Sequence, residues 1–303
     1  DLGDNIVILH NGILDSGRDL TLHTYNGGIE VTDSTLAKRN IKIIVDNQGD
    51  ITFGRDINVV GDVSVETGNG NISVAKKVKS QQGSVDILTK KGNILIGDNG
   101  PDVETVAAYK DVSLQAESGK IEVYGKTYAQ TGDVTLLAGN DAYIAGEAGK
   151  NIIIDHNGEV EAGRDATMIV VNGDIHVTDK LTAGRSFNSE TRKQGNIYVD
   201  KDITVGQDMS MKTENGGINV GEDINAGRNI TMTTGTGDIR VGGSNGKGNV
   251  VAGNHVALTV TSGNVSVDKT VKAKGGNVDV LVKDGDINIG NNGPDVEKVA
   301  AGG

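Results

Sequence analysis

The chain has 303 residues, and its composition is unusual for a globular protein: it has 45 glycines, two prolines, no tryptophan and no cysteine. Aromatic residues make up 3% of the chain, so a core must be built from Val, Ile, Leu, Ala and Met in place of large rings. The formal net charge of −12 excludes a dominant basic surface, and we expect no nucleic-acid partner. No stretch of the sequence reaches 18 apolar residues, so we expect no membrane insertion.

A short phrase of Gly, then Asn or Asp, then Ile or Val recurs along the chain and opens many of the predicted strands. The residues after it alternate between apolar and polar, as in GNISV at 70–74, GDIHV at 173–177 and GNIYV at 195–199. This alternation is typical of a strand with one buried face, and the Gly, Asn and Asp residues between strands supply turns. No segment of 12 residues carries the apolar stripe of a helix, so the sequence predicts an all-β chain.

The predicted strands are spaced regularly in chain order. The leading apolar residues of successive blocks, such as Leu20, Ile41, Val63 and Val85, lie mostly 21 or 22 residues apart. Each step holds about three short strands in the same order. This pattern predicts a parallel β-helix, or solenoid, of about 14 coils of roughly 21 residues each, stacked about 4.8 Å apart. Inward aliphatic side chains would form columns, and glycine would occupy the corners.

A longer repeat is superimposed on the coils. Residues 70–108 align without gaps to residues 263–301, which lie 193 positions later, with 25 identities in 39 positions. We therefore interpret residues 1–303 as a single shaft, with a first copy over about 1–193 and a partial second copy over about 194–303. No capping segment is evident in the second copy, and we expect the chain to be part of a longer repetitive protein.

Both prolines of the chain, Pro101 and Pro294, occupy the same phrase of the long repeat, NGPDVE. Proline suits the first position of a helix, and the acidic residues after it suit the first turn, so the phrase predicts a turn followed by a short helix. We expect this segment to form a structural excursion outside the shaft. A plain loop is the alternative.

One group of acidic residues in the same phrase is a candidate calcium site. Asp98, Asp102 and Glu104 supply the hard oxygen ligands that calcium prefers. The spacing does not match an EF-hand loop, however, and Asn291 replaces Asp98 in the second copy. The alternative is that Asn and Asp at these turns hydrogen-bond their own backbone. We expect no cofactor, with calcium as the one candidate metal.

The residue patterns that carry enzymatic chemistry are absent from the sequence. There is no Asp-Asp pair and no Gly-His-Gly, features by which β-helical hydrolases resemble one another, and no G-x-S-x-G nucleophile elbow. The five histidines lie far apart and show no metal-binding spacing; they are His10, His23, His156, His176 and His255. We therefore expect no catalytic residues and no enzymatic activity.

Three phrases carry a resemblance to a known family: GDVTLLAGNDAYIAG at 132–146, AGRNITMTTGTGDIRVGG at 226–243 and GNHVALTVTSGNVSV at 253–267. They resemble the repetitive shaft of large secreted exoproteins of the filamentous haemagglutinin type, which belong to the two-partner secretion family. The resemblance extends over nearly the whole chain. It implies a right-handed β-helix, secretion across a Gram-negative outer membrane through a partner pore, and a role in adhesion, biofilm formation or contact-dependent inhibition.

Together these observations predict an extracellular fibre or stalk segment of a bacterial surface adhesin, which provides length and rigidity. Its expected partners are neighbouring β-helical repeats or other copies of itself, together with a surface ligand of the host or of another bacterium. A self-assembling surface or matrix filament is the first alternative. A β-helical carbohydrate-active enzyme is the second.

Overall fold

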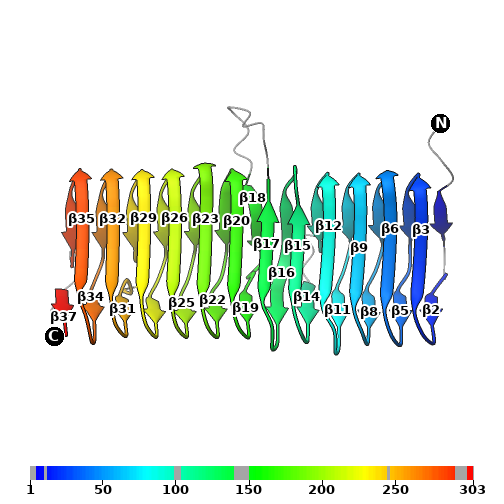
Figure 1. Cartoon of the computed structure of the whole chain (residues 1–303), viewed down its shortest axis with the longest axis horizontal. Helices are drawn as coiled ribbons and strands as arrows, with labels where there is room; N and C mark the ends of the chain where they lie inside the picture. The colour runs from blue at the N-terminus through cyan, green and yellow to red at the C-terminus, as the bar shows by residue number, and fades with distance from the viewer. Residues whose placement is uncertain are drawn as a thin grey trace. The chain divides into compact units, whose positions relative to one another are not determined.

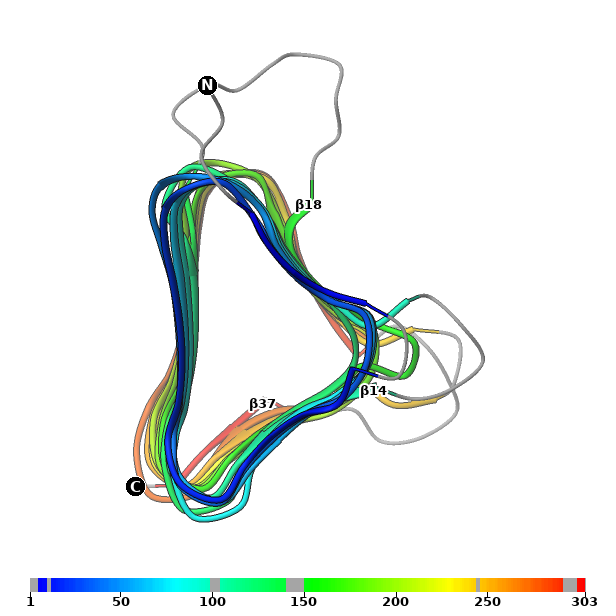
Figure 2. The same ribbon diagram turned by 90° about the vertical axis from the view of Figure 1, so that its right-hand side faces the viewer.

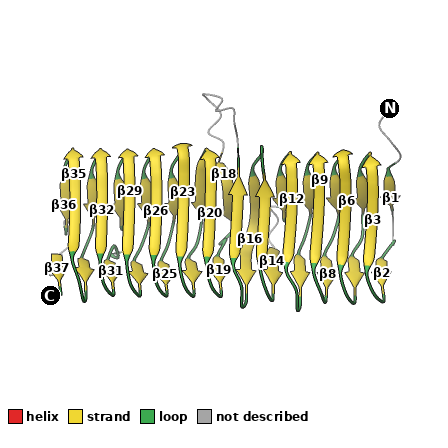
Figure 3. Ribbon diagram, viewed as in Figure 1, coloured by secondary structure: helices red, strands yellow, loops and turns green. Residues whose placement is uncertain are grey.

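The computed structural model describes residues 5–9, 12–98, 104–139, 150–243, 246–290 and 299–302. All regular structure in these ranges is β-strand, and none is helix (Figure 3). The chain divides into two compact units, which are described separately below. Unit 1 comprises Asp1–Asp141 with Asn151–Gly163, and unit 2 comprises Ala142–Lys150 with Arg164–Gly303.

Each unit is a parallel β-solenoid in which every coil visits three faces in the same order. The long face holds strands of five to eight residues, and the two short faces hold mostly three-residue strands. Figure 1 shows the long-face strands of unit 1, from β3 to β17, side by side and pointing the same way. The upward direction of these strands in Figure 1, together with the view from the N-terminal side in Figure 2, makes the coils of unit 1 run clockwise as they recede, which is the sense of a right-handed helix.

The strands of unit 1 fall into three columns. The long face holds β3 (Leu20–Asn26), β6 (Ile41–Gln48), β9 (Val63–Asn69), β12 (Val85–Lys91), β15 (Val112–Ala116) and β17 (Val134–Ala138). The first short face holds β1 (Ile6–Ile8), β4 (Ile29–Val31), β7 (Ile51–Phe53), β10 (Ile72–Val74), β13 (Ile94–Ile96) and β18 (Lys150–Asp155). The second short face holds β2 (Leu14–Ser16), β5 (Thr35–Ala37), β8 (Ile57–Val59), β11 (Val78–Ser80), β14 (Glu104–Ala108) and β19 (Val160–Ala162). The nine-residue strand β16 (Ile121–Ala129) runs through both short faces.

Unit 2 repeats the arrangement. Its long face holds β20 (Ala166–Asn172), β23 (Phe187–Gln194), β26 (Met209–Asn215), β29 (Ile230–Thr236), β32 (Val256–Ser262) and β35 (Val278–Asp284). Its first short face holds β21 (Asp174–Val177), β24 (Ile197–Val199), β27 (Ile218–Val220), β30 (Ile239–Val241), β33 (Val265–Val267) and β36 (Ile287–Ile289). Its second short face holds β22 (Leu181–Ala183), β25 (Ile203–Val205), β28 (Ile224–Ala226), β31 (Val250–Ala252), β34 (Val271–Ala273) and β37 (Val299–Ala301).

The register places like residues on top of one another. On the first short face Ile72 pairs with Ile51 below and with Ile94 above, and all three side chains are fully buried. Alternate residues of each strand point outward, as the period of two predicted. Each inward residue therefore buries its surface against the same position one coil earlier and one coil later, which allows small aliphatic side chains to fill the core.

Both phenylalanines of the chain lie inside the shaft, although a narrow solenoid leaves little room for rings. Phe53 is fully buried between Val31 and Val74, and Phe187 is buried between Ala166 and Met209. In each case at least one neighbouring position holds a smaller side chain, which leaves room for the ring.

The described residues form about 12 coils, with six long-face strands in each unit, compared with the expected number of about 14. The difference arises because several coils are longer than 21 residues. Equivalent positions Ser84 and Asp111 are 27 residues apart, and Asp223 and Asn249 are 26 apart, whereas Asp62 and Ser84 are 22 apart. The additional residues lie between strands and leave the strand register unchanged.

The prediction of a short helix after Pro101 is wrong for the part of that segment that the structure describes. Residues 104–108 form strand β14, which pairs in parallel with β11 on one side and with β16 on the other. Val106 and Ala108 are buried. The local helix signal is overruled because these residues sit between two strands that need a partner. Pro101 and Pro294 themselves, and with them the predicted excursion, lie outside the described residues.

Candidate functional site

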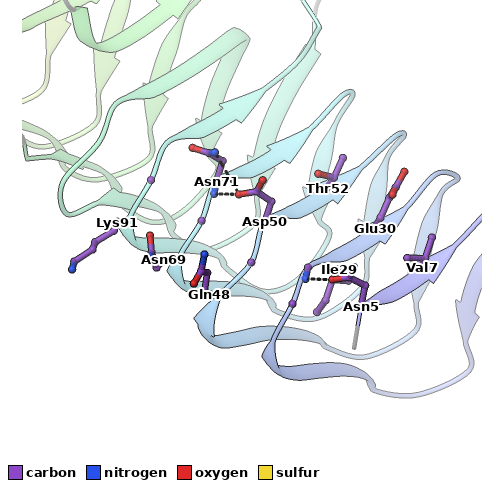
Figure 4. Close-up of a pocket in the computed structure, with 15 residues that line it drawn as sticks. Asn5, Val7, Ile29, Glu30, Gln48, Asp50, Thr52, Asn69, Asn71 and Lys91 are labelled. Carbon is purple, nitrogen blue, oxygen red and sulfur yellow. Dashed lines mark hydrogen bonds between the residues drawn. The ribbon is translucent and has the colours of Figure 1, made fainter. Parts of the chain in front are cut away.

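The most regular surface feature of unit 1 is the corner between the long face and the first short face, which we call the glycine corner (Figure 4). Gly27, Gly49, Gly70 and Gly92 occupy the same place in four successive coils and line a groove of about 600 Å³. A Cβ atom on Gly70 would lie 2.1 Å from the carbonyl oxygen of Gly49, and one on Gly92 would lie 2.0 Å from that of Gly70. Glycine is required here because the coils approach each other backbone to backbone.

One wall of the groove is a ladder of Asp and Asn side chains. The Oδ1 atom of Asp50 accepts a hydrogen bond from the backbone N–H of Asn71 at 2.7 Å. Asn71 Oδ1 in turn accepts from the N–H of Asn93 at 2.9 Å, and Asn93 Oδ1 accepts from the N–H of Lys120 at 3.0 Å. Each side chain therefore binds the backbone of the next coil.

The same ladder occurs at the glycine corner of unit 2. Asp174 Oδ1 accepts from the N–H of Asn196 at 2.7 Å, and Asp238 Oδ1 accepts from that of Asn264 at 2.8 Å. The own-backbone bond does occur at other turns, as between Asp33 Oδ1 and the N–H of Ser34 at 2.8 Å. The choice depends on whether a neighbouring coil presents an N–H group within reach of the side chain.

A column of inward-facing threonines supports the glycine corner from inside the shaft, and the sequence interpretation did not identify it. Thr67 Oγ1 and Thr89 Oγ1 each donate a hydrogen bond, at 2.8 Å, to the carbonyl oxygens of Gly49 and Gly70. In unit 2, Thr213 Oγ1 donates to the carbonyl oxygen of Gly216 at 2.6 Å. The available signal was a threonine at the fifth residue of a long strand, where alternation demands an inward side chain.

The opposite wall of the unit 1 groove carries Gln48, Asn69 and Lys91, which are register partners in β6, β9 and β12. The groove therefore has amide and lysine side chains on one wall, Asp and Asn side chains on the other, and glycine backbone at its floor. These ladder oxygens already accept backbone hydrogen bonds, so the arrangement joins successive coils.

A second polar groove, of about 550 Å³, lies on the first short face of unit 2. Its lining includes Asp238, Arg240, Asp268 and Asp286. The Arg240 guanidinium donates to Asp238 Oδ2 at 2.7 Å, and this bond holds the pKa of the Asp238 carboxyl below its usual value despite partial burial.

A lysine in unit 2 joins three successive coils. Lys247 Nζ contacts Asp202 Oδ2 at 3.0 Å and Glu222 Oε2 at 2.5 Å. The two carboxylates raise the pKa of Lys247. Burial raises the pKa of Asp202, but hydrogen bonds from the Asp223 N–H and from Lys247 outweigh it, and the pKa lies below its usual value. Asp202 and Asp223 lie close together in successive coils, and the backbone N–H of Asp223 donates to Asp202 Oδ1 at 3.0 Å. The Lys247 ammonium offsets the repulsion between these two carboxylates.

Of the three calcium candidates, only Asp98 has its side chain among the described residues. Asp98 forms an ion pair with Lys76, Nζ to Oδ2, at 3.0 Å. Asp102 and the side chain of Glu104 lie outside what the structure describes, although the backbone of Glu104 begins β14. Among the described residues there is no group of three or more His, Cys, Asp or Glu residues arranged to hold a metal ion.

The histidines that the structure describes have separate surroundings. The Nε2 atom of His23 lies 2.8 Å from Asp46 Oδ2, and that of His176 lies 2.9 Å from Asp200 Oδ1. His156 stacks edge-on against Tyr124, and His255 Nδ1 accepts from the N–H of Asn277 at 3.0 Å. His10 lies outside the described residues.

In the part of the chain that the structure describes, no helix has the length and apolar character needed to cross a membrane. A scan against protein-family models, a search of the curated proteins and a search of the solved structures each gave no match to this chain.

Proposed function

We propose that this chain is a structural segment of an extracellular fibre or stalk on the surface of a Gram-negative-type bacterium, and that it gives length and rigidity to an adhesin that acts in adhesion or biofilm formation. The observation that carries the proposal is the parallel pairing of coils within each unit. Each long-face strand of unit 1, from β3 to β17, pairs with the equivalent strand of the next coil.

This pairing aligns backbone hydrogen bonds with the direction in which coils are added. Each coil adds about 4.8 Å to the stack, and bending would stretch the backbone hydrogen bonds on one side of the stack and compress those on the opposite side. The glycine corner and its Asp and Asn ladder join the coils at the points where the backbone turns. Stiffness along the stack is therefore the mechanical property that this construction supports.

The charged side chains on the outside also connect successive coils. Lys201 Nζ lies 2.7 Å from Asp179 Oδ2, and Arg39 Nη1 lies 3.5 Å from Asp19 Oδ2. The net charge of −12 opposes sideways association of shafts at low ionic strength. The partners we propose for this segment are therefore neighbouring β-helical repeats, and the proposed role includes no catalysis.

A self-assembling filament, in which coils of separate chains stack end to end, is the second candidate.

The test places the 303-residue chain between a cell-surface anchor and a reporter binding domain, on cells coated with a polymer brush. The control replaces the chain with a flexible Gly/Ser linker of the same number of residues, which behaves as a random coil. The proposal predicts capture of immobilised ligand with the chain and little capture with the linker. Equal capture by both would contradict it. Size-exclusion chromatography of the isolated chain separates the two candidates, because a monomer supports the stalk and spontaneous polymers support the filament.

A further inference from the structure

Four Asn-Gly pairs occupy one recurring position in the coils. The sequence contains nine such pairs, and in these four the Asn is the last residue of a long-face strand and the Gly begins the glycine corner. Because glycine has no side chain to hinder its nitrogen, an asparagine before glycine readily loses its side-chain nitrogen as ammonia. The four asparagines are Asn26, Asn69, Asn172 and Asn215, at the ends of β3, β9, β20 and β26.

The loss of ammonia is a cyclisation within the chain. The glycine nitrogen forms a bond to Cγ of the asparagine, and the bond from Cγ to the side-chain nitrogen breaks. That nitrogen leaves as ammonia and takes the proton that the glycine N–H gives up. One water molecule then opens the five-membered imide ring at either carbonyl, which leaves aspartate or isoaspartate. The glycine N–H must therefore be free to lose its proton, and the asparagine Cβ must turn into the plane of the following peptide.

The pairing of coils opposes both steps at Asn69. The N–H of Gly70 donates to the carbonyl oxygen of Lys91 at 2.8 Å, and the carbonyl oxygen of Asn69 accepts from the N–H of Gly49 at 3.0 Å. The peptide that would react is thus bound to the coils on both sides. Asn69 lies between its register partners Gln48 and Lys91 (Figure 4), and the ψ of about +115° in a parallel strand holds Cβ away from the peptide plane.

The other three pairs are bound in the same way. In unit 2 the N–H of Gly216 donates to the carbonyl oxygen of Thr236 at 2.7 Å, and the carbonyl oxygen of Asn215 accepts from the N–H of Gly195 at 2.8 Å. The two remaining glycine N–H groups also donate to the next coil at 2.7 Å, Gly27 to Gln48 and Gly173 to Gln194.

Exclusion of water does not explain protection at two of these sites. The side chain of Asn172 is only 8% exposed, but Asn69 and Asn215 are exposed at the surface. Their amides meet solvent while their backbones remain paired. Protection at these two sites therefore depends on the pairing itself and is lost whenever the coil opens.

We propose that Asn26, Asn69, Asn172 and Asn215 are latent deamidation sites. The pairing of each coil with its neighbour keeps the site unreactive, and opening of that coil allows conversion to aspartate or isoaspartate. The imide nitrogen carries no proton, so the hydrogen bond to the next coil cannot form again while the ring is closed. Isoaspartate then leaves one additional methylene group in the main chain at the corner. The modification thus makes the opening of a single coil irreversible.

The test follows deamidation site by site in the 303-residue chain, incubated at mildly alkaline pH. Peptide mapping by mass spectrometry measures aspartate and isoaspartate at Asn69 and Asn215. Synthetic peptides of residues 63–74 and 209–220 give the rates of the same sequences without paired coils. The proposal predicts rates in the folded chain about a hundredfold or more below those of the peptides, because a paired coil is open for only a small fraction of the time.

Two threonine variants weaken the two corners separately. Thr89 Oγ1 and Thr213 Oγ1 donate hydrogen bonds to the carbonyl oxygens of the glycines that follow Asn69 and Asn215. Without that bond the corner opens more often, so we expect about fivefold faster deamidation of Asn69 in Thr89→Val and of Asn215 in Thr213→Val. Each variant is the control for the other, because the site in the distant coil should keep its rate.

Deamidation of Asn69 or Asn215 in the folded chain at the rate of its peptide would overturn the proposal, since pairing would then give no protection. An unchanged rate at the nearby site in both variants would overturn it as well. Equal acceleration at both sites in either variant would contradict the opening of single coils. None of these outcomes depends on the extracellular role, so the fibre proposal stands or falls separately.

Discussion

The Oδ1 atom of Asn71 accepts a hydrogen bond from the backbone N–H of Asn93, 22 residues later, at 2.9 Å. The Nδ2 atom of Asn93 lies 3.2 Å from the same oxygen, so one side chain holds both the backbone and the side chain of the next coil. Repeated from Asp50 onward, this contact fixes the spacing of the coils at the corner where glycine permits their closest approach.

Replacing Asn71 with alanine should weaken the shaft at that corner. The variant loses the acceptor for the Asn93 N–H and the bond from the Asn71 Nδ2 atom to Asp50 Oδ1 at 3.4 Å, while the backbone N–H of residue 71 still donates to Asp50. Because the side chain is exposed and water can replace part of what is lost, we expect a decrease of about 0.5–1.5 kcal/mol in the free energy of unfolding. Urea denaturation followed by circular dichroism measures the change. Asn71→Asp keeps the acceptor but sets a second carboxylate beside Asp50, so its stability should recover at high salt, which screens that repulsion, while that of Asn71→Ala should not; no such difference would contradict the ladder's role.

The threonine column can be tested at Thr213, which is 1% exposed and donates to the carbonyl oxygen of Gly216 at 2.6 Å. Thr213→Val keeps the shape of the side chain but leaves that carbonyl without its donor. We expect a loss of about 1 kcal/mol in the free energy of unfolding. Thr233→Val, on the outward face of the next strand, is the matched control and should change stability by less than about 0.5 kcal/mol. Equal effects of the two substitutions would show that the inward hydroxyl contributes nothing.

Glycine at the corner of unit 2 should tolerate no side chain. Gly195 has a φ of +139°, and a Cβ atom there would lie 1.8 Å from the carbonyl oxygen of Gly173. The strained backbone alone should cost Gly195→Ala about 1–3 kcal/mol, and the clash adds to it. Gly246 has a φ of +68° but open space around its Cβ position, so Gly246→Ala should show the backbone strain without the clash. Thermal unfolding compares the two variants, and similar melting temperatures would argue against close packing of the coils.

The acid stability of unit 2 should depend on its paired carboxylates. The pKa of Asp238 is lowered by the hydrogen bond from Arg240, and that of Asp208 is lowered because bonds from Arg228 and Asn229 outweigh its burial. A carboxyl whose pKa is lower in the folded state stabilises the fold above the unfolded value of about 4, and this stabilisation is lost as the pH falls through the folded pKa. Hydrogen exchange of residues 230–262 should therefore quicken, beyond its intrinsic pH dependence, as the pH falls below about 4.

The variant Asp238→Asn isolates one of these carboxyls, because it keeps the acceptor for Asn264 and removes the titrating group. Its stability should fall less steeply than that of the unmodified chain between pH 5 and pH 2. An unchanged slope would mean that the ion pair with Arg240 does not contribute to the acid response.

Much of the fold could be predicted from the sequence, because each coil of a solenoid repeats the same strands and turns and the sequence pattern repeats with it. Alternation in segments such as Ile72–Val74 gave the strands, and their repetition gave the parallel stacking of coils. The number of coils was overestimated because the additional residues of the longer coils, as between Asp223 and Asn249, form no additional strand.

Predictions from short stretches of sequence were wrong where pairing with a neighbouring coil determines the structure. The sequence before Val106 favours a helix start, yet residues 104–108 are a strand, because Val78 on one side and Thr127 on the other offer them backbone partners. The partner of a turn residue likewise lies in another coil: Asp50 Oδ1 accepts a hydrogen bond from the N–H of Asn71 one coil later. These contacts connect residues about 20 or more positions apart, and a short window of sequence does not contain them.

The most direct test of the stacked coils is a series of distances along one column of unit 1. Thr21, Lys42, Ser64, Asp86, Ser113 and Thr135 are successive register partners on the long face. The chain has no cysteine, so spin labels can be attached to introduced cysteines, with one label at Thr21 and the second at Asp86, Ser113 or Thr135. Stacking predicts that the distance between the labels grows by about 4.8 Å with each coil, over three, four and five coils. Distances that fail to increase from Asp86 to Thr135 would contradict the solenoid and the proposals that depend on it.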